Sequence, residues 1–471
     1  MRCCRTGGGQ QRLRFRLLLL VFLLLSFHLF SFSTFAAVWP SAELTAQAGV
    51  VLDVDTGTVL FEKNGTERLY PASITKVMTA LVVLEHAKLG EKVTFSHDAV
   101  YNVDSGSSNA QIDEGDVLTV EDCLYALLLK SANEAANALA EHVAGSRAAF
   151  AELMNEKAAE LGCTGTHFAN PSGLWEEEHY TTAEDMARIG RAAFQNEDFL
   201  RIEESRSHRI APSKRVPEGL MIYMEHKMLL PNSVYYDERV VAGKTGYTLA
   251  SGNTLLTLAK SGGRRLAAVV LGDKNPAHYT DTRTLLDLGF NQTEKRTLPD
   301  SFYNMEMLRN RLVQDTVAED SLKSSELELK GSRLVSVPLG TEETELHYRL
   351  NYNVPENAPQ RAVAEIEYLL GDRQVGSDFI VKAQSIRILI EDAPAGTKAA
   401  AAAVTLSGFT VLGIVLFALF GGGAAAWARR LHGERQRRKE LRENRLRRLR
   451  ELDMSEEEFR ELVEKRRKKR G

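Results

Sequence analysis

The order of apolar and polar positions along the chain predicts two short strands followed by a run of helices. Residues 48–64 form two alternating apolar runs around an Asp55-Thr56-Gly57 turn, which is the pattern of a β-hairpin. Thr119 lies three residues before Asp122 in a capping-box pattern, and Thr181 or Thr182 is expected to cap a later helix. Apolar residues recur at helical spacing in residues 73–88, 123–130, 133–145, 149–162 and 181–194.

The strand pattern returns after these helices. Residues 240–273 read as three successive strands, with a turn at Ser261-Gly262-Gly263, and residues 280–290 close the unit as a helix. Strands at both ends of a helical segment predict one shared sheet with helices packed on it, which is an α+β fold spanning residues 43–292. Short alternating runs at close spacing predict a separate small all-β domain over residues 298–392.

Long apolar segments lie near both ends of the chain. Arginines precede an apolar run from Leu17 to Phe30, and small residues follow it, so residues 1–37 are predicted to be a secretory signal peptide. An uncleaved signal anchor is the alternative. Residues 399–427 carry no charge, and a transmembrane helix is expected over residues 402–427. The basic residues 428–471 then form a cytoplasmic tail, because cytoplasmic flanks carry the positive charge.

Composition and charge narrow the function classes. The 471 residues include 26% charged and 44% hydrophobic residues, which is ordinary globular composition and excludes a wholly disordered or collagen-like chain. The net charge of -4 divides into +8 for residues 429–471 (18 basic minus 10 acidic) and -12 for the rest (41 minus 53). An acidic body is unsuited to general nucleic-acid binding. The tail is read as a solvated stop-transfer segment or as a docking helix for an unknown cytoplasmic partner.

Four cysteines are too few for a disulfide framework. Cys3 and Cys4 lie in the predicted signal peptide, which leaves Cys123 and Cys163. Their expected state is either two unpaired thiols in the core or a single disulfide.

Ser73-Ile-Thr-Lys76 is the first candidate for chemistry. Residues three apart at the start of a helix share one face, so the lysine lies within reach of the serine hydroxyl. A serine needs a base before it can act as a nucleophile, and burial or a second cation lowers the pKa of a lysine enough for that role. A helix N-terminus also presents a backbone N–H to a developing oxyanion. Alone, the pattern also fits a capping serine beside a solvated lysine.

Two further motifs follow in the chain. Ser131-Ala132-Asn133 falls between two predicted helices, where it presents a hydroxyl and an amide or simply caps the second helix. Residues 244–246, Lys-Thr-Gly, lie in a predicted strand. A glycine in a strand indicates close approach of a ligand or backbone, and the lysine and threonine suit a carboxylate. Alone, the motif fits an exposed strand edge with a surface lysine equally well.

The three motifs together indicate much more than each alone. Their order, S-x-x-K, S-x-N and K-T-G, is typical of penicillin-binding proteins and class A β-lactamases. The chain resembles the low-molecular-mass penicillin-binding proteins, the serine-type D-alanyl-D-alanine carboxypeptidases of the peptidase S11 family. The resemblance extends from about residue 48 to residue 390 and includes VLDVDTGTVLFEKN, YPASITKVMTALV, KSANEAANALAEHVAGS, THFANPSGL, TTAEDMARI, VAGKTGYT and LLDLGF.

This resemblance implies a β-lactamase-like fold and a role for each motif residue. Ser73 would be the acylated nucleophile, Lys76 its base and Ser131 a participant in proton transfer. Asn133 would bind the substrate amide. The strand that holds Gly246 would line the substrate site, with Lys244 and Thr245 on the terminal carboxylate, and the N–H groups of Ser73 and Tyr247 would form the oxyanion hole. The implied substrates are peptidoglycan stem peptides, the implied inhibitors are β-lactams, and no cofactor or metal is implied.

The chain departs from the family pattern in three places. The middle triplet has Ala132 where many relatives have glycine, and His278 stands where relatives often have arginine. The predicted membrane span replaces the amphipathic C-terminal helix that often tethers relatives. We therefore expect a single-pass protein of the cell membrane, with its catalytic domain outside the cytoplasm.

Other functions share part of this pattern. A D,D-endopeptidase acting on wall cross-links uses the same chemistry. A class A β-lactamase needs a glutamate-activated water, for which Glu176, Glu177 and Glu178 lie in the right stretch. A wall-binding protein without activity would not need the complete motif set. A metallo-carboxypeptidase is disfavoured because no histidine lies in an H-E-x-x-H or similar pair.

Overall fold

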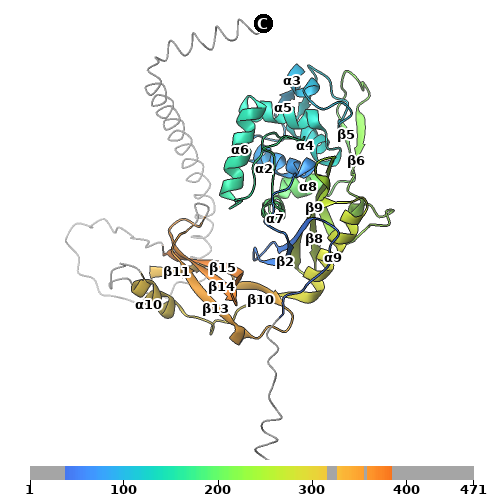
Figure 1. Cartoon of the computed structure of the whole chain (residues 1–471). Helices are drawn as coiled ribbons and strands as arrows, with labels where there is room; N and C mark the ends of the chain where they lie inside the picture. Colours follow the sequence, from blue (N-terminus) through green and yellow to red (C-terminus); the bar gives the residue numbers. More distant parts are fainter. Residues whose placement is uncertain (1–37, 316–325, 355–357, 384–471) are drawn as a thin grey trace, which may run out of the picture. The chain divides into compact units, whose positions relative to one another are not determined.

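The computed structural model describes residues 38–315, 326–354 and 358–383, which all belong to the first of two units of the chain, residues 1–386 (Figure 1). The predicted signal peptide, transmembrane helix and basic tail lie outside the described residues. Within the described residues, no helix has both the length and the apolar character needed to cross a bilayer.

One antiparallel sheet organises the first hydrophobic core. Its strand order is β2-β1-β9-β8-β7, and the predicted N-terminal hairpin pairs directly with the late strands, since Val50 is opposite Val269. The expected shared sheet and the α+β class are confirmed. The strands are β1 (Ala48–Asp53), β2 (Val59–Lys63), β7 (Val240–Thr248), β8 (Gly252–Ser261) and β9 (Arg264–Asp273).

Helices cover the sheet and complete the same hydrophobic core. Consecutive buried residues in β1, β8 and β9 show that both sheet faces are covered, and α7 and α9 pack against these strands (Figure 1). The Thr119 and Thr182 hydroxyls cap α4 and α7, as their patterns predicted. The helices are η1 (Ala72–Thr75), α2 (Lys76–His86), α3 (His97–Tyr101), α4 (Val120–Leu129), α5 (Asn133–Ala144), α6 (Arg147–Glu160), α7 (Ala183–Ala193), α8 (Glu197–Glu203), η2 (Lys227–Leu229) and α9 (Ala277–Gln292).

Two small hairpins lie beside the helices. In each of them, the two strands pair with one another outside the main sheet. They consist of β3 (Lys92–Thr94) with β4 (Val117–Thr119), and β5 (Ser207–Ile210) with β6 (Leu220–Tyr223).

A second core lies in the β-rich residues after α9. Four strands pair in the order β11-β15-β14-β13, and β10 pairs with β12. The segment also contains helix α10 (Met305–Asp315), so the expectation that it is all-β is wrong there. Asn304 accepts the Met307 N–H, and Leu308 and Leu312 bury the same helix face. The strands are β10 (Thr293–Thr297), β11 (Leu327–Lys330), β12 (Leu334–Pro338), β13 (Leu346–Asn351), β14 (Ala362–Leu370) and β15 (Arg373–Lys382), with a short η4 (Glu343–Glu345).

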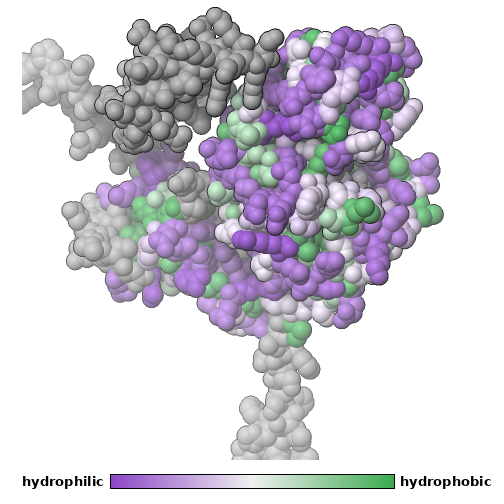
Figure 2. Space-filling model, turned by 45° about the horizontal axis from the view of Figure 1, so that its top comes forward, coloured by the Kyte–Doolittle hydropathy of each residue, from purple (hydrophilic) through white to green (hydrophobic). Residues whose placement is uncertain are grey.

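Contacts join the two cores. Trp39 packs against both, and Lys295 on β10 forms an ion pair with Asp55 of the N-terminal hairpin. Cys123 and Cys163 are buried and free, as the unpaired alternative predicted. The visible face in Figure 2 is largely hydrophilic with scattered hydrophobic residues, which is ordinary for a protein surface in water.

Candidate active site

Ser73 and Lys76 meet at the junction of η1 and α2. Ser73 lies inside the 3-10 turn rather than capping it, and the turn continues into α2 at Lys76. The Lys76 Nζ is 3.0 Å from the Ser73 Oγ. Ala72, just before the serine, has a left-handed φ of 51°, a conformation that costs a residue with a side chain about 1 kcal/mol or more. Such strain concentrates where a fold must present one atom in one direction.

The Lys76 amine has three oxygen neighbours. Besides the serine, the Asn133 Oδ1 is 2.7 Å away and the Ser172 carbonyl oxygen is 2.5 Å away. Those two oxygens are acceptors only. A neutral amine has two N–H donors and one lone pair. When both donors bind Asn133 and Ser172, the lone pair is left for the Ser73 hydroxyl proton.

The surroundings of Lys76 favour this neutral form. Its side chain is fully buried. Burial lowers the pKa of Lys76 well below its usual value, the charge of Lys244 lowers it further, and the Glu134 carboxylate opposes the shift. Lys76 is therefore better suited to take the serine proton than an ordinary surface lysine is.

The Ser131–Asn133 triplet occupies the turn between α4 and α5. Ser131 is buried and has a left-handed φ of 61°, and Asn133 begins α5. The turn is held by the Asn133 N–H, which donates to the Ser108 carbonyl. In the described part of the chain, no hydrogen bond joins the Ser131 hydroxyl to Ser73 or Lys76. The structure thus brings Asn133 onto the lysine, whereas a proton-transfer role for Ser131 stays a prediction.

The Lys-Thr-Gly motif lies on β7, an edge strand of the sheet. A Cβ atom added to Gly246 would lie 2.4 Å from the Thr254 Oγ1 and 2.9 Å from the Ser73 backbone nitrogen. Only glycine allows the strand to pass this close to the serine. The backbone around Gly246 and the Ser73 N–H therefore face the same small space, and the exposed Tyr247 follows at the rim.

Lys244 is buried but sparsely bonded. Its Nζ donates to the Thr245 carbonyl at 3.0 Å, and this is its one hydrogen bond among the described residues. Burial lowers the pKa of Lys244 from its ordinary value, and Glu203 is the foremost of the charges that oppose this. Its two other N–H donors are available to a ligand.

Sequence reasoning missed the loop that holds Lys76 from behind. The Asn170 Oδ1 accepts the N–H groups of Ser172 and Gly173, which fixes the turn. A Cβ on Gly173 would lie 2.0 Å from the Ala72 carbonyl oxygen, so the loop packs directly on η1. The turn signature Asn170-Pro171-Ser172-Gly173 was visible in the sequence. The signature could not show that the backbone carbonyl of Ser172, and not its side chain, accepts a hydrogen bond from Lys76.

A histidine supports the same loop. The His179 Nδ1 accepts the Ala169 N–H, so its Nε2 carries the proton and donates to the Thr75 Oγ1 at 2.8 Å. Burial lowers the pKa of His179 to about 3. It is therefore neutral and holds η1 and the loop together without adding charge near Lys76.

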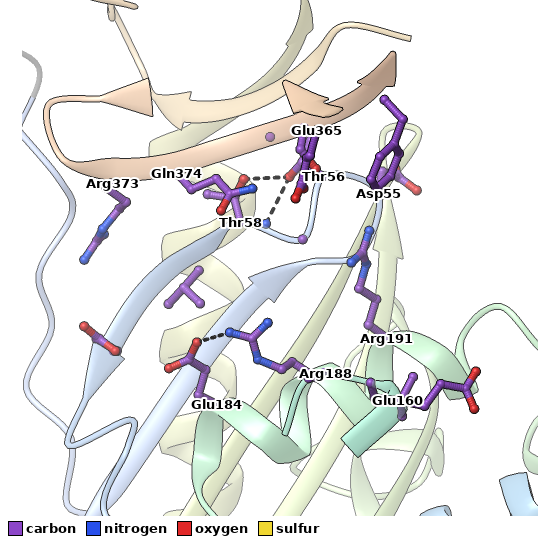
Figure 3. A pocket seen from close by; sticks show the side chains of 18 of the residues that line it. Asp55, Thr56, Thr58, Glu160, Glu184, Arg188, Arg191, Glu365, Arg373 and Gln374 are labelled. Atoms are coloured by element: carbon purple, nitrogen blue, oxygen red, sulfur yellow. Dashed lines mark hydrogen bonds and ion pairs between the residues drawn. The ribbon is translucent and has the colours of Figure 1, made fainter. Parts of the chain in front are cut away.

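A separate polar pocket lies away from these motifs (Figure 3). It is lined by the Asp55–Val59 turn, by α6 and α7, and by β14 and β15. Arg188 and Glu184 pair on its wall at 2.5 Å. None of the motif residues lines it, so it is not the site of the predicted chemistry. Within the described residues, no group of three or more His, Cys, Asp or Glu side chains is placed to hold a metal ion.

Comparison with known proteins places the chain in a family. The family model described as D-alanyl-D-alanine carboxypeptidase, Peptidase_S11, matches residues 34–275. D-alanyl-D-alanine carboxypeptidase DacF of Bacillus subtilis is 34% identical over 262 residues, which cover 54% of this chain and 64% of the relative. DacB2 of Mycobacterium tuberculosis is 34% identical over 257 residues, or 53% of this chain and 84% of the relative.

A solved structure shares the fold. Penicillin binding protein 6B from Escherichia coli superposes with a TM-score of 0.53 at 26% identity, over 74% of this chain and 98% of that protein. The matched part spans less than two thirds of DacF but nearly all of the solved structure. With the family model matching just over half of the residues, the chain belongs to the peptidase S11 family of D-alanyl-D-alanine carboxypeptidases.

Proposed function

We propose that this protein is a serine-type D-alanyl-D-alanine carboxypeptidase. It removes the terminal D-alanine from peptidoglycan stem pentapeptides through an acyl-enzyme, and β-lactams acylate the same serine. The observation that carries the proposal is the Lys76 amine. It is buried, held by two acceptor oxygens and 3.0 Å from the Ser73 hydroxyl, which is the arrangement of a general base and its nucleophile.

Acylation follows from this geometry. The Ser73 Oγ attacks the carbonyl carbon of the D-alanyl-D-alanine bond while its proton moves to the Lys76 Nζ. The carbonyl oxygen becomes an oxyanion, and the N–H groups of Ser73 and Tyr247 are the proposed donors to it. Breaking of the C–N bond then releases D-alanine, whose nitrogen takes the proton back, with Ser131 as the proposed relay. Water attacks the ester in the second half-reaction and restores the free serine.

The sheet side of the cleft recognises the substrate. Lys244 has N–H donors to spare, and Thr245 adds a hydroxyl on the same strand. A charge-assisted hydrogen bond from this pair to the terminal carboxylate selects peptides that end in a free D-alanine. Asn133, whose Oδ1 accepts from Lys76, has its amide N–H groups left for the peptide backbone of the substrate.

The alternative activities differ from the proposed one in the rate of deacylation or in the leaving group. Rapid β-lactam hydrolysis needs a buried glutamate that activates water. Glu176, Glu177 and Glu178 are all exposed, and the Glu176 Oε1 accepts from the Asn170 amide. This arrangement favours slow deacylation and inhibition over β-lactamase activity. Endopeptidase action on cross-links uses the same acyl-enzyme and differs in the leaving group.

The location of the protein is part of the proposal. Residues 1–37 act as a signal peptide, residues 402–427 cross the cell membrane once, and residues 428–471 stay in the cytoplasm. The support is the uncharged segment followed by Arg429 and Arg430, together with the apolar run from Leu17 to Phe30 that follows a group of arginines. Protease digestion of intact and permeabilised cells tests this topology with an antibody to the tail.

The activity is tested by incubating the full chain with a stem pentapeptide and measuring the masses of the products by mass spectrometry. Release of one D-alanine with formation of the tetrapeptide supports the proposal. Cleavage of cross-linked dimers without release of D-alanine from the pentapeptide would instead assign an endopeptidase. Fast turnover of penicillin without either reaction would assign a β-lactamase.

A further inference from the structure

Glu203 is a buried carboxyl group that the proposed mechanism does not use. It is the last residue of α8, which packs against α2, α4 and β7, and its side chain has no solvent exposure. Burying a carboxylate costs free energy unless the group is paired and fully hydrogen-bonded. The group therefore calls for a functional explanation.

The Glu203 carboxylate supports the strand at the motif lysine. Its Oε2 accepts the Gly243 N–H at 3.0 Å, and its Oε1 has no hydrogen-bond partner among the described residues. A Cβ at Gly243 would lie 2.8 Å from the His226 ring. The backbone immediately before Lys244 therefore lies against both Glu203 and His226.

The charges around Lys244 leave Glu203 as its counter-charge. Glu225 also favours the charged lysine, but it already pairs with Lys130 at 2.7 Å at an exposed site, and Lys130 opposes it. The charge of Lys244 lowers the pKa of Lys76, and in its neutral form Lys76 adds no charge beside Lys244. Burial lowers the pKa of His226 to about 3, so that ring is neutral and contributes no charge.

We propose that Glu203 is a positioning residue whose carboxylate keeps Lys244 protonated and holds β7 so that this lysine faces the substrate carboxylate. The consequence for catalysis rests on the proposed carboxypeptidase function. The charge relation between the two side chains does not depend on it.

The proposal fixes the sign of the pH dependence. An ionised Glu203 holds the Lys244 proton more tightly, so removing that charge lets Lys244 lose its proton at lower pH. Burial raises the pKa of Glu203 to about 7, so the carboxylate provides its charge mainly above neutral pH. A variant without the charge should match the wild type near pH 6 and fall behind it as the pH rises.

Glu203→Gln is the informative change, because the amide oxygen still accepts the Gly243 N–H while the charge is lost. Glu204→Gln is the matched control, since Glu204 is the next residue, is exposed and lies 3.6 Å from Lys260. Glu203→Asp keeps the charge on a shorter side chain, so it should retain part of the effect of Glu203 on the pKa of Lys244. This variant takes the place of Glu203→Gln in the measurements if Glu203→Gln does not fold.

The first measurement is kcat/KM from pH 6 to 9 for a pentapeptide with a free end and for the same peptide with an amidated end. For Glu203→Gln we expect the alkaline limb to move to lower pH for the free peptide only. The ratio of wild-type to variant kcat/KM should be close to 1 at pH 6 and should rise with pH. For a shift of one unit in the pKa of Lys244, it approaches about 10-fold above that pKa. An equal loss on both peptides at every pH would overturn the proposal.

The second measurement needs no activity. In protein with 13C-labelled lysine, the signal absent from Lys244→Gln belongs to Lys244, and its titration gives the pKa directly. A lower pKa in Glu203→Gln but not in Glu204→Gln supports the proposal, and an unchanged pKa overturns it. If the wild type releases no D-alanine, the proposed function fails, while this titration still decides the role of Glu203.

Discussion

The candidate site has a helical wall (Ser73, Lys76 and Asn133) and a sheet wall (Lys244 to Gly246). Each wall holds a buried lysine, and the two lysines are bonded very differently. On the helical wall, the Lys76 amine has three oxygens within 3.0 Å, from Ser73, Asn133 and Ser172. On the sheet wall, the Lys244 ammonium has one such oxygen among the described residues, the Thr245 carbonyl. A group with every hydrogen-bonding position in use is fixed for one proton transfer, whereas a group with free donors is ready to bind a ligand.

The charges follow the same division. Burial lowers the pKa of both lysines, but Lys76 is lowered further by the neighbouring Lys244, while Lys244 is supported by Glu203. Lys76 should therefore lose its proton at a lower pH than Lys244. Between the pKa of Lys76 and the pKa of Lys244, Lys76 is a neutral base while Lys244 is still a cation, and we expect the proposed reaction to run in this pH range.

The largest effect is expected from Ser73→Ala. The change removes the nucleophile, so covalent labelling by a fluorescent penicillin should disappear. The fold should persist, because the Ser73 hydroxyl makes no helix-cap bond and its hydrogen-bond partner among the described residues is Lys76. Gel fluorescence with circular dichroism as the folding check measures both. Labelling at another serine would show that Ser73 is not the nucleophile.

Lys76→Met tests the base on that wall. Methionine has a similar volume but cannot take the serine proton, so the acylation rate should fall at least about 100-fold, the low end for lost acid–base catalysis. Stopped-flow acylation by a chromogenic cephalosporin gives the rate. Because Asn133 and Ser172 lose a donor, some loss of melting temperature is expected as well.

Lys157→Met is the matched control for this loss of stability. Lys157 lies on α6, is mostly buried and pairs with Glu85 and Glu160, so its removal should lower stability without slowing acylation. If both methionine variants acylated at the same rate, Lys76 would be a structural residue only.

The sequence predicted the fold to the extent that local patterns define it. The period of two in residues 48–64 and 240–273 identified β1, β2 and β7–β9, and strands at both ends of the domain implied one sheet. Helix α10 was missed because, among those of its side chains that the structure describes, only Leu308 and Leu312 are buried apolar residues, which is too weak a helical signal.

The motif residues were predicted, but not the groups that adjust them. Ser73, Lys76 and Lys244 could be named because each belongs to a short spaced motif. Ser172 could not, because it acts through a carbonyl that any residue has. Glu203 could not, because its burial beneath β7 results from packing between elements far apart in the sequence.

Gly246→Ala tests how closely the two walls must approach. The new methyl group would lie 2.4 Å from the Thr254 Oγ1 and 2.9 Å from the Ser73 nitrogen, so β7 must move away from the serine. A displacement of about 1 Å in a catalytic site costs on the order of 100-fold in rate, and acylation should fall by that factor. Gly90→Ala is the control, since a Cβ there meets no atom within 4 Å. Normal acylation in Gly246→Ala would mean that the walls need not touch.

The effect of Lys244→Gln is the one that depends on the substrate. A charge-assisted hydrogen bond contributes about 1.5–3 kcal/mol, so kcat/KM for a free-carboxylate pentapeptide should fall roughly 10- to 150-fold. The amidated peptide has no charge to lose and should be affected much less. Thr245→Val should act in the same direction, but more weakly.

His278 makes the upper part of that range the expected one for Lys244→Gln. Burial lowers the pKa of His278, so its ring is uncharged at neutral pH and adds no second cation for the carboxylate. The measurement is kcat/KM for both peptides on wild type and Lys244→Gln. An equal loss on both would remove the contrast between the walls. Lys244 would then act on the chemistry by lowering the pKa of Lys76. The sheet wall would in that case support the base and would not bind the substrate.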